Sequence, residues 1–217
     1  MKRILSVAVL LMLTLTLCAC GKDSKTPSDS NNGQSTSSKS ESTFEMGTVT
    51  GNKYSNEFLG IGCTLDSDWT FSTDEQIRET NSISTDLLDE EMQSQLENAS
   101  IVYDMMATCS NGDSININIE NLGISGALAT PETYINSQTD SLKTALEQIG
   151  LSDVVIDNKT FDFAGSSEKG IYVSGTINGV KLEEAIIVLK RGTRFANVTV
   201  TTINGKINDI IAQFHAL

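Results

Sequence analysis

The segment GIYVSGTINGVKLEEAIIVLKRGTRFANVTVTT, residues 170–202, predicts three consecutive antiparallel strands. Asn178-Gly179 separates two apolar runs, and this dipeptide is the strongest short signal of a β-hairpin because its turn needs positive φ. Residues 190–193 form the next turn, and the third strand covers residues 195–202. Strands joined by such short turns pair with their neighbours in the chain, so the segment places an antiparallel sheet at the centre of the fold.

Two upstream segments add a half-buried strand and a long helix. Ile115, Ile117 and Ile119 alternate with polar residues, a period of two that is typical of a strand with one face in the core. Thr130-Pro131 is a strong helix start, because threonine caps free N–H groups and proline suits the first helical position. An apolar stripe follows, and Gly150 ends the predicted helix.

Shorter elements complete the predicted order. Ser72 and Glu75 predict a capping box on a short helix, and a second helix begins at Ser84 or Thr85 and runs to about Asn98. Asn204 is predicted to cap a last helix that includes Phe214. The remaining strands are predicted over residues 54–58, 60–65, 101–109, 154–157 and 160–163. This order indicates an α+β fold in which helices cover an antiparallel sheet.

The chain begins with a segment that resembles a bacterial lipoprotein signal peptide. Lys2 and Arg3 precede an apolar stretch over residues 4–17, which is shorter than the roughly 20 residues of a membrane-spanning helix. Leu17-Cys18-Ala19-Cys20 is similar to a lipobox, with a leucine three residues before the cysteine and a small residue directly before it. The resemblance implies cleavage before Cys20 and a diacylglyceryl group on its sulfur. A plain signal peptide and an uncleaved anchor are the alternatives.

These features divide the chain into three parts. We predict a lipoprotein signal peptide over residues 1–19, a disordered tether over residues 20–45 and one globular domain over residues 46–217. The tether is rich in polar residues, with Phe44 as its only apolar residue after Cys20, so it cannot bury enough surface to fold. A chain of this length spans roughly 25–30 Å, which lifts the domain clear of lipid headgroups.

The charge balance excludes nucleic acid as a partner. The chain has 15 basic and 28 acidic residues, a formal net charge of −13, whereas phosphate binding needs a basic surface. Removal of Lys2 and Arg3 with the leader leaves 13 basic residues and a net charge of −15. A polybasic membrane signal is then missing, so the lipid on Cys20 has to hold the chain. Two acyl chains do so firmly, where one binds marginally.

The domain resembles PsbP-type domains over most of residues 54–214. The similar stretches are YSNEFLGIGCTLDSDWTF (54–71), TPETYINSQTDSLKTALEQIG (130–150) and SGTINGVKLEEAIIVLKRGTRFANVTVTT (174–202). The resemblance implies an α/β/α sandwich with a central antiparallel sheet and a non-catalytic binding or assembly role. It transfers no site residue. The chain is also similar to uncharacterised lipoproteins of low-GC Gram-positive bacteria, which implies the outer face of the cell membrane in a Gram-positive type of envelope.

Cys63 and Cys109 both lie in predicted strands. Outside the cell, a disulfide is permitted if the two strands are neighbours. Two separately buried thiols are the alternative. A catalytic thiol would need a nearby base, and the single histidine, His215, lies close to the C-terminus.

Three further groups each have an ordinary and a functional interpretation. Trp69 follows a turn and either packs in the core or stacks on a ligand. The basic cluster of the domain is a polar hairpin tip or a contact for acidic polymers or lipid headgroups; it consists of Lys190, Arg191 and Arg194. An acidic group forms a solvated helix start or a cation site; it consists of Asp86, Asp89, Glu90 and Glu91. Because EF-hand spacing is missing, we predict no metal, and we predict no cofactor.

Two classes of function fit these observations. We expect a non-enzymatic, membrane-anchored extracytoplasmic module that binds or assembles with an unknown envelope protein, because no catalytic set is visible in the sequence. The alternative is a small-ligand or solute-binding lipoprotein. A carboxylate-dependent hydrolase ranks third and would need paired acids with raised pKa values in a cleft. A large apolar pocket would favour ligand binding, and a flat exposed patch would favour assembly.

Overall fold

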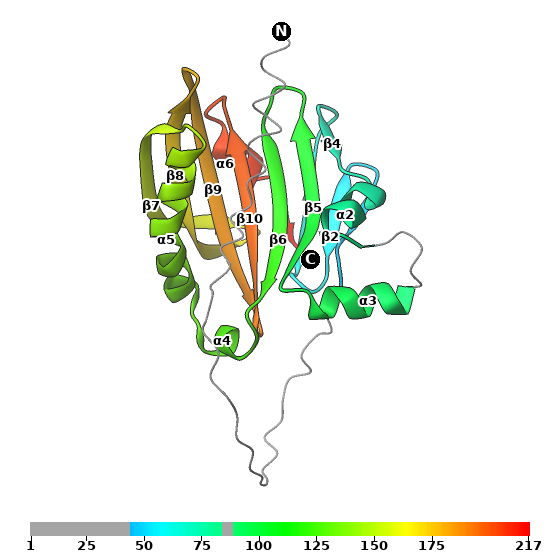
Figure 1. Cartoon of the computed structure of the whole chain (residues 1–217). Helices are drawn as coiled ribbons and strands as arrows, with labels where there is room; N and C mark the ends of the chain where they lie inside the picture. The colour runs from blue at the N-terminus through cyan, green and yellow to red at the C-terminus, as the bar shows by residue number, and fades with distance from the viewer. Residues whose placement is uncertain (1–43, 84–88) are drawn as a thin grey trace.

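The fold is built on a seven-stranded antiparallel sheet with the strand order β4-β5-β6-β10-β9-β8-β7 (Figure 1). The computed structural model describes residues 44–83 and 89–217. The strands are β4 (Trp69–Phe71), β5 (Ile101–Cys109), β6 (Ser114–Asn121), β7 (Ser152–Phe163), β8 (Ser166–Ile177), β9 (Val180–Arg191) and β10 (Arg194–Thr202). The predicted run of three strands is confirmed as β8, β9 and β10, which pair in register through both turns.

A second, four-stranded antiparallel sheet joins the two ends of the domain. Its order is β1-β2-β3-β11. The strands are β1 (Thr48–Thr50), β2 (Lys53–Asn56), β3 (Ile61–Thr64) and β11 (Phe214–Ala216). Ile61 and Cys63 share its buried face, as their alternation predicts, and Phe214 pairs with Cys63.

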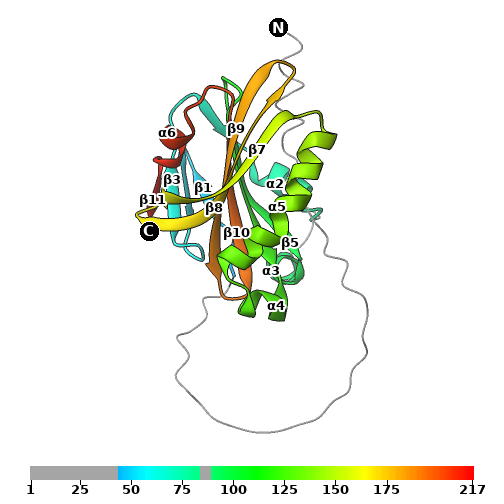
Figure 2. The same ribbon diagram turned by 90° about the vertical axis from the view of Figure 1, so that its left-hand side faces the viewer.

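Two hydrophobic clusters occupy the two faces of the large sheet. The helices are α2 (Asp74–Thr80), α3 (Asp89–Asn98), α4 (Gly123–Leu128), α5 (Pro131–Gln148) and α6 (Ile207–Ile211). Helix α5 covers one face, and the small sheet with α6 covers the other (Figure 2). The α+β class with antiparallel sheets is confirmed. The expected layer of helices on the second face is replaced by the small sheet.

Helix α5 begins as the sequence predicts. The Thr130 side chain accepts a hydrogen bond from the Thr133 N–H, and the Thr133 side chain accepts one from the Thr130 N–H, so free donors at the start of the helix are satisfied. Tyr134 then stacks on Phe195 of β10, with ring centroids 4.6 Å apart, which fixes the helix to the sheet.

Other predicted boundaries were wrong. The cap of α2 is Thr73 with Gln76, because the backbone of Ser72 still bonds to Met106 of β5. The last helix ends at Ile211, and Phe214 belongs to a strand. Asn204 donates to Asp113 and caps nothing. The start of the helix predicted from Ser84 or Thr85 lies outside the described residues.

The domain begins earlier than the sequence predicts. Phe44, assigned to the tether, is only 6% exposed and meets the ring of Phe58 edge-on at 5.3 Å. Gln93 donates to the Phe44 carbonyl, and the Arg194 guanidinium lies 4.1 Å from the Phe44 ring centre. The first described residue is therefore held to the domain by packing.

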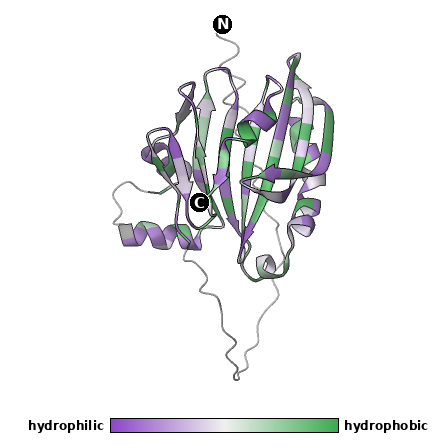
Figure 3. Ribbon diagram, turned by 180° about the vertical axis from the view of Figure 1, so that it is seen from behind, coloured by the Kyte–Doolittle hydropathy of each residue, from purple (hydrophilic) through white to green (hydrophobic). Residues whose placement is uncertain are grey.

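Helix α3 differs from the strands in its surface. Figure 3 shows it almost entirely in the colour of hydrophilic residues, whereas the strands carry many apolar ones. Leu96 is buried and attaches α3 to the core. None of the helices in the described residues has the length and apolar character needed to cross a bilayer.

Candidate functional site

A cavity of about 300 Å³ lies beside β5, where the small sheet parts from the large one. Its walls come from the chain leading into β1, from α2 and α3, and from the middle of β5. We call it the methionine pocket; it is lined by Met46, Gly47, Thr48, Val49, Ser72, Asp74, Ile77, Arg78, Asn81, Ile83, Met92, Asp104, Met105 and Met106. Its volume is at the lower end of the range of small-molecule sites, roughly 300–1,000 Å³.

The methionines of the described residues gather at this cavity. The sequence has 6 methionines, of which Met1 and Met12 belong to the predicted leader. All the others, Met46, Met92, Met105 and Met106, line the pocket, although they come from three separate parts of the chain. A thioether side chain is unbranched and polarisable, so it adapts to apolar ligands of different shapes.

A β-bulge aims one carboxyl at the pocket. The pairing of β5 with β6 shifts between Tyr103 and Met105, so Asp104 is the extra residue of the bulged strand. Bulges of this kind redirect a side chain and often lie beside functional sites. Asp104 therefore points toward the small sheet together with Met105, and both are buried.

Three hydrogen-bond donors from residues 47–56 of the same chain hold the Asp104 carboxyl. The Tyr54 hydroxyl and the Asn56 amide, the latter at 2.9 Å, donate to Oδ2, and the Gly47 N–H donates to Oδ1 at 2.7 Å. Burial raises the pKa of Asp104, and the three hydrogen bonds oppose that rise. It is the one buried carboxyl among the lining residues, since Asp74 is exposed. Within the described residues, the lining does not contain the buried carboxyl pair that the hydrolase hypothesis required.

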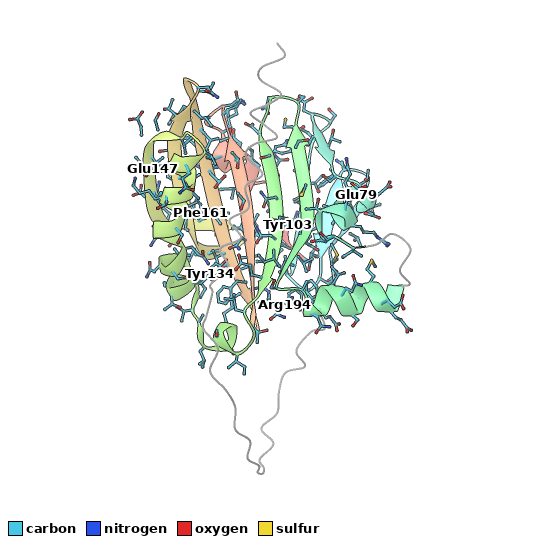
Figure 4. All side chains as sticks on the ribbon, in the orientation of Figure 1. Glu79, Tyr103, Tyr134, Glu147, Phe161 and Arg194 are labelled. Atoms are coloured by element: carbon cyan, nitrogen blue, oxygen red, sulfur yellow. The ribbon has the colours of Figure 1, made fainter. Side chains whose placement is uncertain are left out.

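Asn81 fixes the end of α2 against β5. Its side chain donates to the Tyr103 carbonyl at 2.8 Å and accepts from the Tyr103 N–H at 2.7 Å. The Asn81 side chain thus satisfies both backbone groups of Tyr103, as a neighbouring strand would do. The contact keeps α2 beside the pocket. Figure 4 shows Tyr103 on β5 and Glu79 on α2, on either side of this junction.

A second, more open hollow of about 500 Å³ continues from the pocket. It shares Val49, Ser72 and Asp74 with the pocket and extends to Trp69 and Phe71 of β4. Trp69 is half-buried and packs on the core. Trp69 therefore makes a packing contact and also lines this hollow, and its stacking on a ligand stays a prediction.

No family model matches the sequence, and no curated protein matches it. The fold has a distant likeness among solved structures. It aligns with the crystal structure of LpqN involved in cell envelope biogenesis of Mycobacterium tuberculosis. The TM-score is 0.36 and the sequence identity is 12%, over 71% of this chain and 82% of that chain. The functional argument therefore rests on the residues of the site.

The three basic residues at the β9–β10 turn bind backbone carbonyls of this domain. Lys190 donates to the carbonyls of Ala127 and Ala129, at 3.2 and 2.6 Å. Arg191 donates to the Leu59 carbonyl, and Arg194 is buried and donates to the Glu97 carbonyl at 2.7 Å. Their charges thus tie α4, the β2–β3 connection and α3 to the large sheet, instead of forming one open basic patch.

Cys63 and Cys109 are free thiols in the structure. Cys63 lies in β3 of the small sheet, and Cys109 ends β5 of the large sheet, where it pairs with Trp69. The two strands are not neighbours, which was the condition for a disulfide. Burial raises the pKa of Cys63 to about 12, so its thiol is protonated at neutral pH.

The remaining sequence candidates do not appear among the described residues that line the pocket. Asp86 and Cys20 lie outside the described residues. Glu90 and Glu91 lie on exposed positions of α3. Groups of three or more His, Cys, Asp or Glu side chains placed to hold a metal are not found within residues 44–83 and 89–217.

Sequence inspection missed Asp104 and Tyr54, the polar centre of the site. One signal was available, because Asp104 is the single charged residue of the apolar strand IVYDMMATC. It also missed a polar cluster under α5, where Asn197 donates to Asn118 and Tyr134 at 3.0 and 2.8 Å. That cluster joins β6, β10 and α5 and is explained by packing.

Proposed function

We propose that this chain is a lipid-anchored, non-enzymatic binding protein of the cell envelope and that its ligand binds in the methionine pocket. The observation that carries the proposal is the gathering of Met46, Met92, Met105 and Met106 around one cavity of about 300 Å³. A cavity favours the ligand-binding class over the assembly class, which a flat apolar patch would have favoured.

The lining defines the chemistry of the ligand. Its thioethers and Ile77 offer an apolar, adaptable surface, and Arg78 and Asp74 add charges to the lining. The volume suits one ring system or a short aliphatic chain. We therefore propose a small, mostly apolar ligand, or an apolar side chain of an envelope protein partner.

The non-enzymatic role is supported by the residues around the cavity. Asp104 already accepts three hydrogen bonds, and the Cys63 thiol is buried with a raised pKa, so neither is prepared to act as a base or nucleophile. His215 lies in β11 and is absent from the pocket lining.

The anchor and the location are parts of the same proposal. The lipobox-like sequence ending at Cys20 supports cleavage before Cys20, lipidation of its sulfur and a position on the outer face of the cell membrane. We retain the PsbP-like resemblance as a proposal as well, supported by the long helix and the Asn178-Gly179 hairpin.

The test uses ¹³C-methyl methionine NMR of the full chain. Each methionine gives one signal, and a panel of small aromatic and short-chain aliphatic compounds is titrated in. We expect binders to shift the pocket signals together, with Met1 and Met12 as internal references when present. Binding that leaves all pocket signals in place, or no binder in the panel, would contradict the proposal.

A matched pair of variants locates the binding. Met92→Asp places a charge in the pocket lining and is expected to abolish binding. Gln95→Asp adds the same charge at an exposed position of the same helix and is expected to leave affinity unchanged. Equal loss in both variants would remove the pocket as the site.

A further inference from the structure

Helix α4 exposes two large apolar side chains to solvent. Ile124 is 86% exposed and Leu128 is 84% exposed, whereas the next most exposed large apolar residue of the described chain, Leu217, is 52% exposed. The two are four residues apart on one helix and therefore lie on the same side of it. Single exposed apolar residues are common, but two at this level on one turn form a concentrated apolar tip.

This tip is held rigidly by the large sheet. The Leu122 N–H donates to the Thr193 carbonyl at 3.3 Å, and Gly126 lies so close to that carbonyl that an added Cβ would meet it at 2.1 Å. Lys190 donates to two carbonyls at the other end of the helix. The apolar pair is thus presented by a fixed element.

The tip lies at the end of the domain where the tether arrives. Thr193, which contacts α4, is followed by Arg194, whose guanidinium lies over the ring of Phe44. Figures 1 and 4 show α4 and Arg194 at the same end of the large sheet. Phe44 is the first described residue, and the chain before it leads back to Cys20. The proposed tether starts from this end of the domain, and because a flexible chain fluctuates about its r.m.s. span of roughly 25–30 Å, this end comes within reach of the surface that holds the lipid.

We propose that α4 is a membrane-contacting tip, with Ile124 and Leu128 inserted into the interface of the bilayer that anchors the chain. The inference rests on the lipidation of Cys20 in the proposed function. We take the lipid surface as the partner of the exposed apolar pair, because the pair and the start of the proposed tether lie at the same end of the domain.

The contact is apolar and not electrostatic. Lys190, Arg191 and Arg194 donate to neutral backbone carbonyls of this domain and keep their positive charges, but these side chains are tied to the domain and are not free to reach a surface. We expect the apolar pair to insert into zwitterionic phosphatidylcholine vesicles, where no net lipid charge contributes to binding.

The test measures the depth of a tryptophan in the lipidated full chain. Leu128→Trp is combined with Trp69→Phe, and the chain is placed in phosphatidylcholine vesicles with brominated acyl chains. We expect about twofold quenching or more, because interfacial side chains lie about 5–10 Å into the headgroup and acyl boundary. The matched control is Val180→Trp, which is 42% exposed in the wild type and starts β9 at the opposite end of the sheet. The control should remain unquenched.

A second measurement needs no substitution in the core. In the unaltered lipidated chain, hydrogen exchange of residues 123–128 is expected to be several-fold slower on vesicles than in a dispersing detergent, and Ile124→Ser with Leu128→Ser should remove that difference.

A chain retained on vesicles with an unquenched tryptophan and unchanged exchange would overturn the membrane contact alone. A chain washed from the vesicles would overturn the anchor and this inference with it. A dimer in solution that the two serine substitutions dissociate would assign the tip to a second copy and overturn the lipid contact.

Discussion

The hydroxyl of Tyr54 donates a hydrogen bond to the carboxyl of Asp104 and so joins the small sheet to the bulge of the large one. Both residues are buried. Tyr54→Phe removes one donor from a buried carboxyl, and we expect a loss of about 1–3 kcal/mol in the free energy of unfolding. Urea denaturation at pH 7 measures it. An unchanged midpoint would show that the bond contributes nothing to stability.

The raised pKa of Asp104 makes the stability pH-dependent. Its folded-state pKa lies above the unfolded value near 3.8, so the folded state binds the proton more tightly. Stability from this group is therefore greatest at low pH and falls as pH rises from the unfolded pKa through the folded one. Asp104→Asn does not titrate, so the wild type should lose stability relative to this variant as pH rises. Parallel urea titrations from pH 4 upward test it, and a constant difference would contradict it.

Lys190 should act as a structural donor. Lys190→Met keeps the apolar stem but leaves the carbonyls of Ala127 and Ala129 without this partner, and we expect about 1–2 kcal/mol of destabilisation. Lys181→Met is the matched control, because the Lys181 side chain is 70% exposed. Thermal unfolding of both variants should separate them. Equal melting temperatures would show that the hydrogen bonds of Lys190 contribute no more to stability than an exposed charge does.

Gly126 should tolerate no larger residue. Its Cβ would lie 2.1 Å from the Thr193 carbonyl oxygen, a backbone atom that cannot move independently. We expect Gly126→Ala to cost about 1–3 kcal/mol of stability through overpacking. Ser125→Ala, at an exposed position of the same helix, should cost little. Chemical denaturation gives both values, and a Gly126→Ala protein as stable as wild type would mean that α4 can shift.

The two thiols of the domain should differ in reactivity. Cys63 is buried with a pKa of about 12, whereas Cys109 is half-buried. A thiol reagent such as DTNB should label Cys109 in the folded protein and Cys63 only after unfolding. Cys109→Ser and Cys63→Ser assign the two phases. A protein purified under oxidising conditions with no titratable thiol in the domain would instead show that the two are bonded.

Local patterns were enough to predict the three-strand run and α5. The Asn178-Gly179 turn and the Thr130 cap depend on residues only a few positions apart, so their signals are complete within short windows. The end of the chain is different. Phe214 continues a helical spacing in the sequence, but it pairs with Cys63 in β3, which is far away in the chain. Because of that pairing, Phe214 forms a strand and not a helix.

The candidate site could not be predicted, because it exists only after long-range contacts form. Met46, Met92 and Met105 carry no local signal that they meet. The basic cluster was visible in the sequence, but its role was not. Lys190, Arg191 and Arg194 donate to carbonyls of distant segments, which the sequence does not identify. Helix α4 was missed since its sequence GISGAL contains two glycines and is held by contacts to Thr193 and Lys190.

The burial of Phe44 has a mechanical consequence for the proposed lipid anchor. In the lipid-anchored chain that we propose, a pull on the lipid reaches the domain at Phe44, whose ring packs on Phe58 and lies against the Arg194 guanidinium. Two further contacts, from Gln93 to the Phe44 carbonyl and from the Gly47 N–H to Asp104, share the load before it reaches β1. Force therefore enters the core through several parallel bonds, so drag on the domain does not begin by peeling β1 from the edge of its sheet.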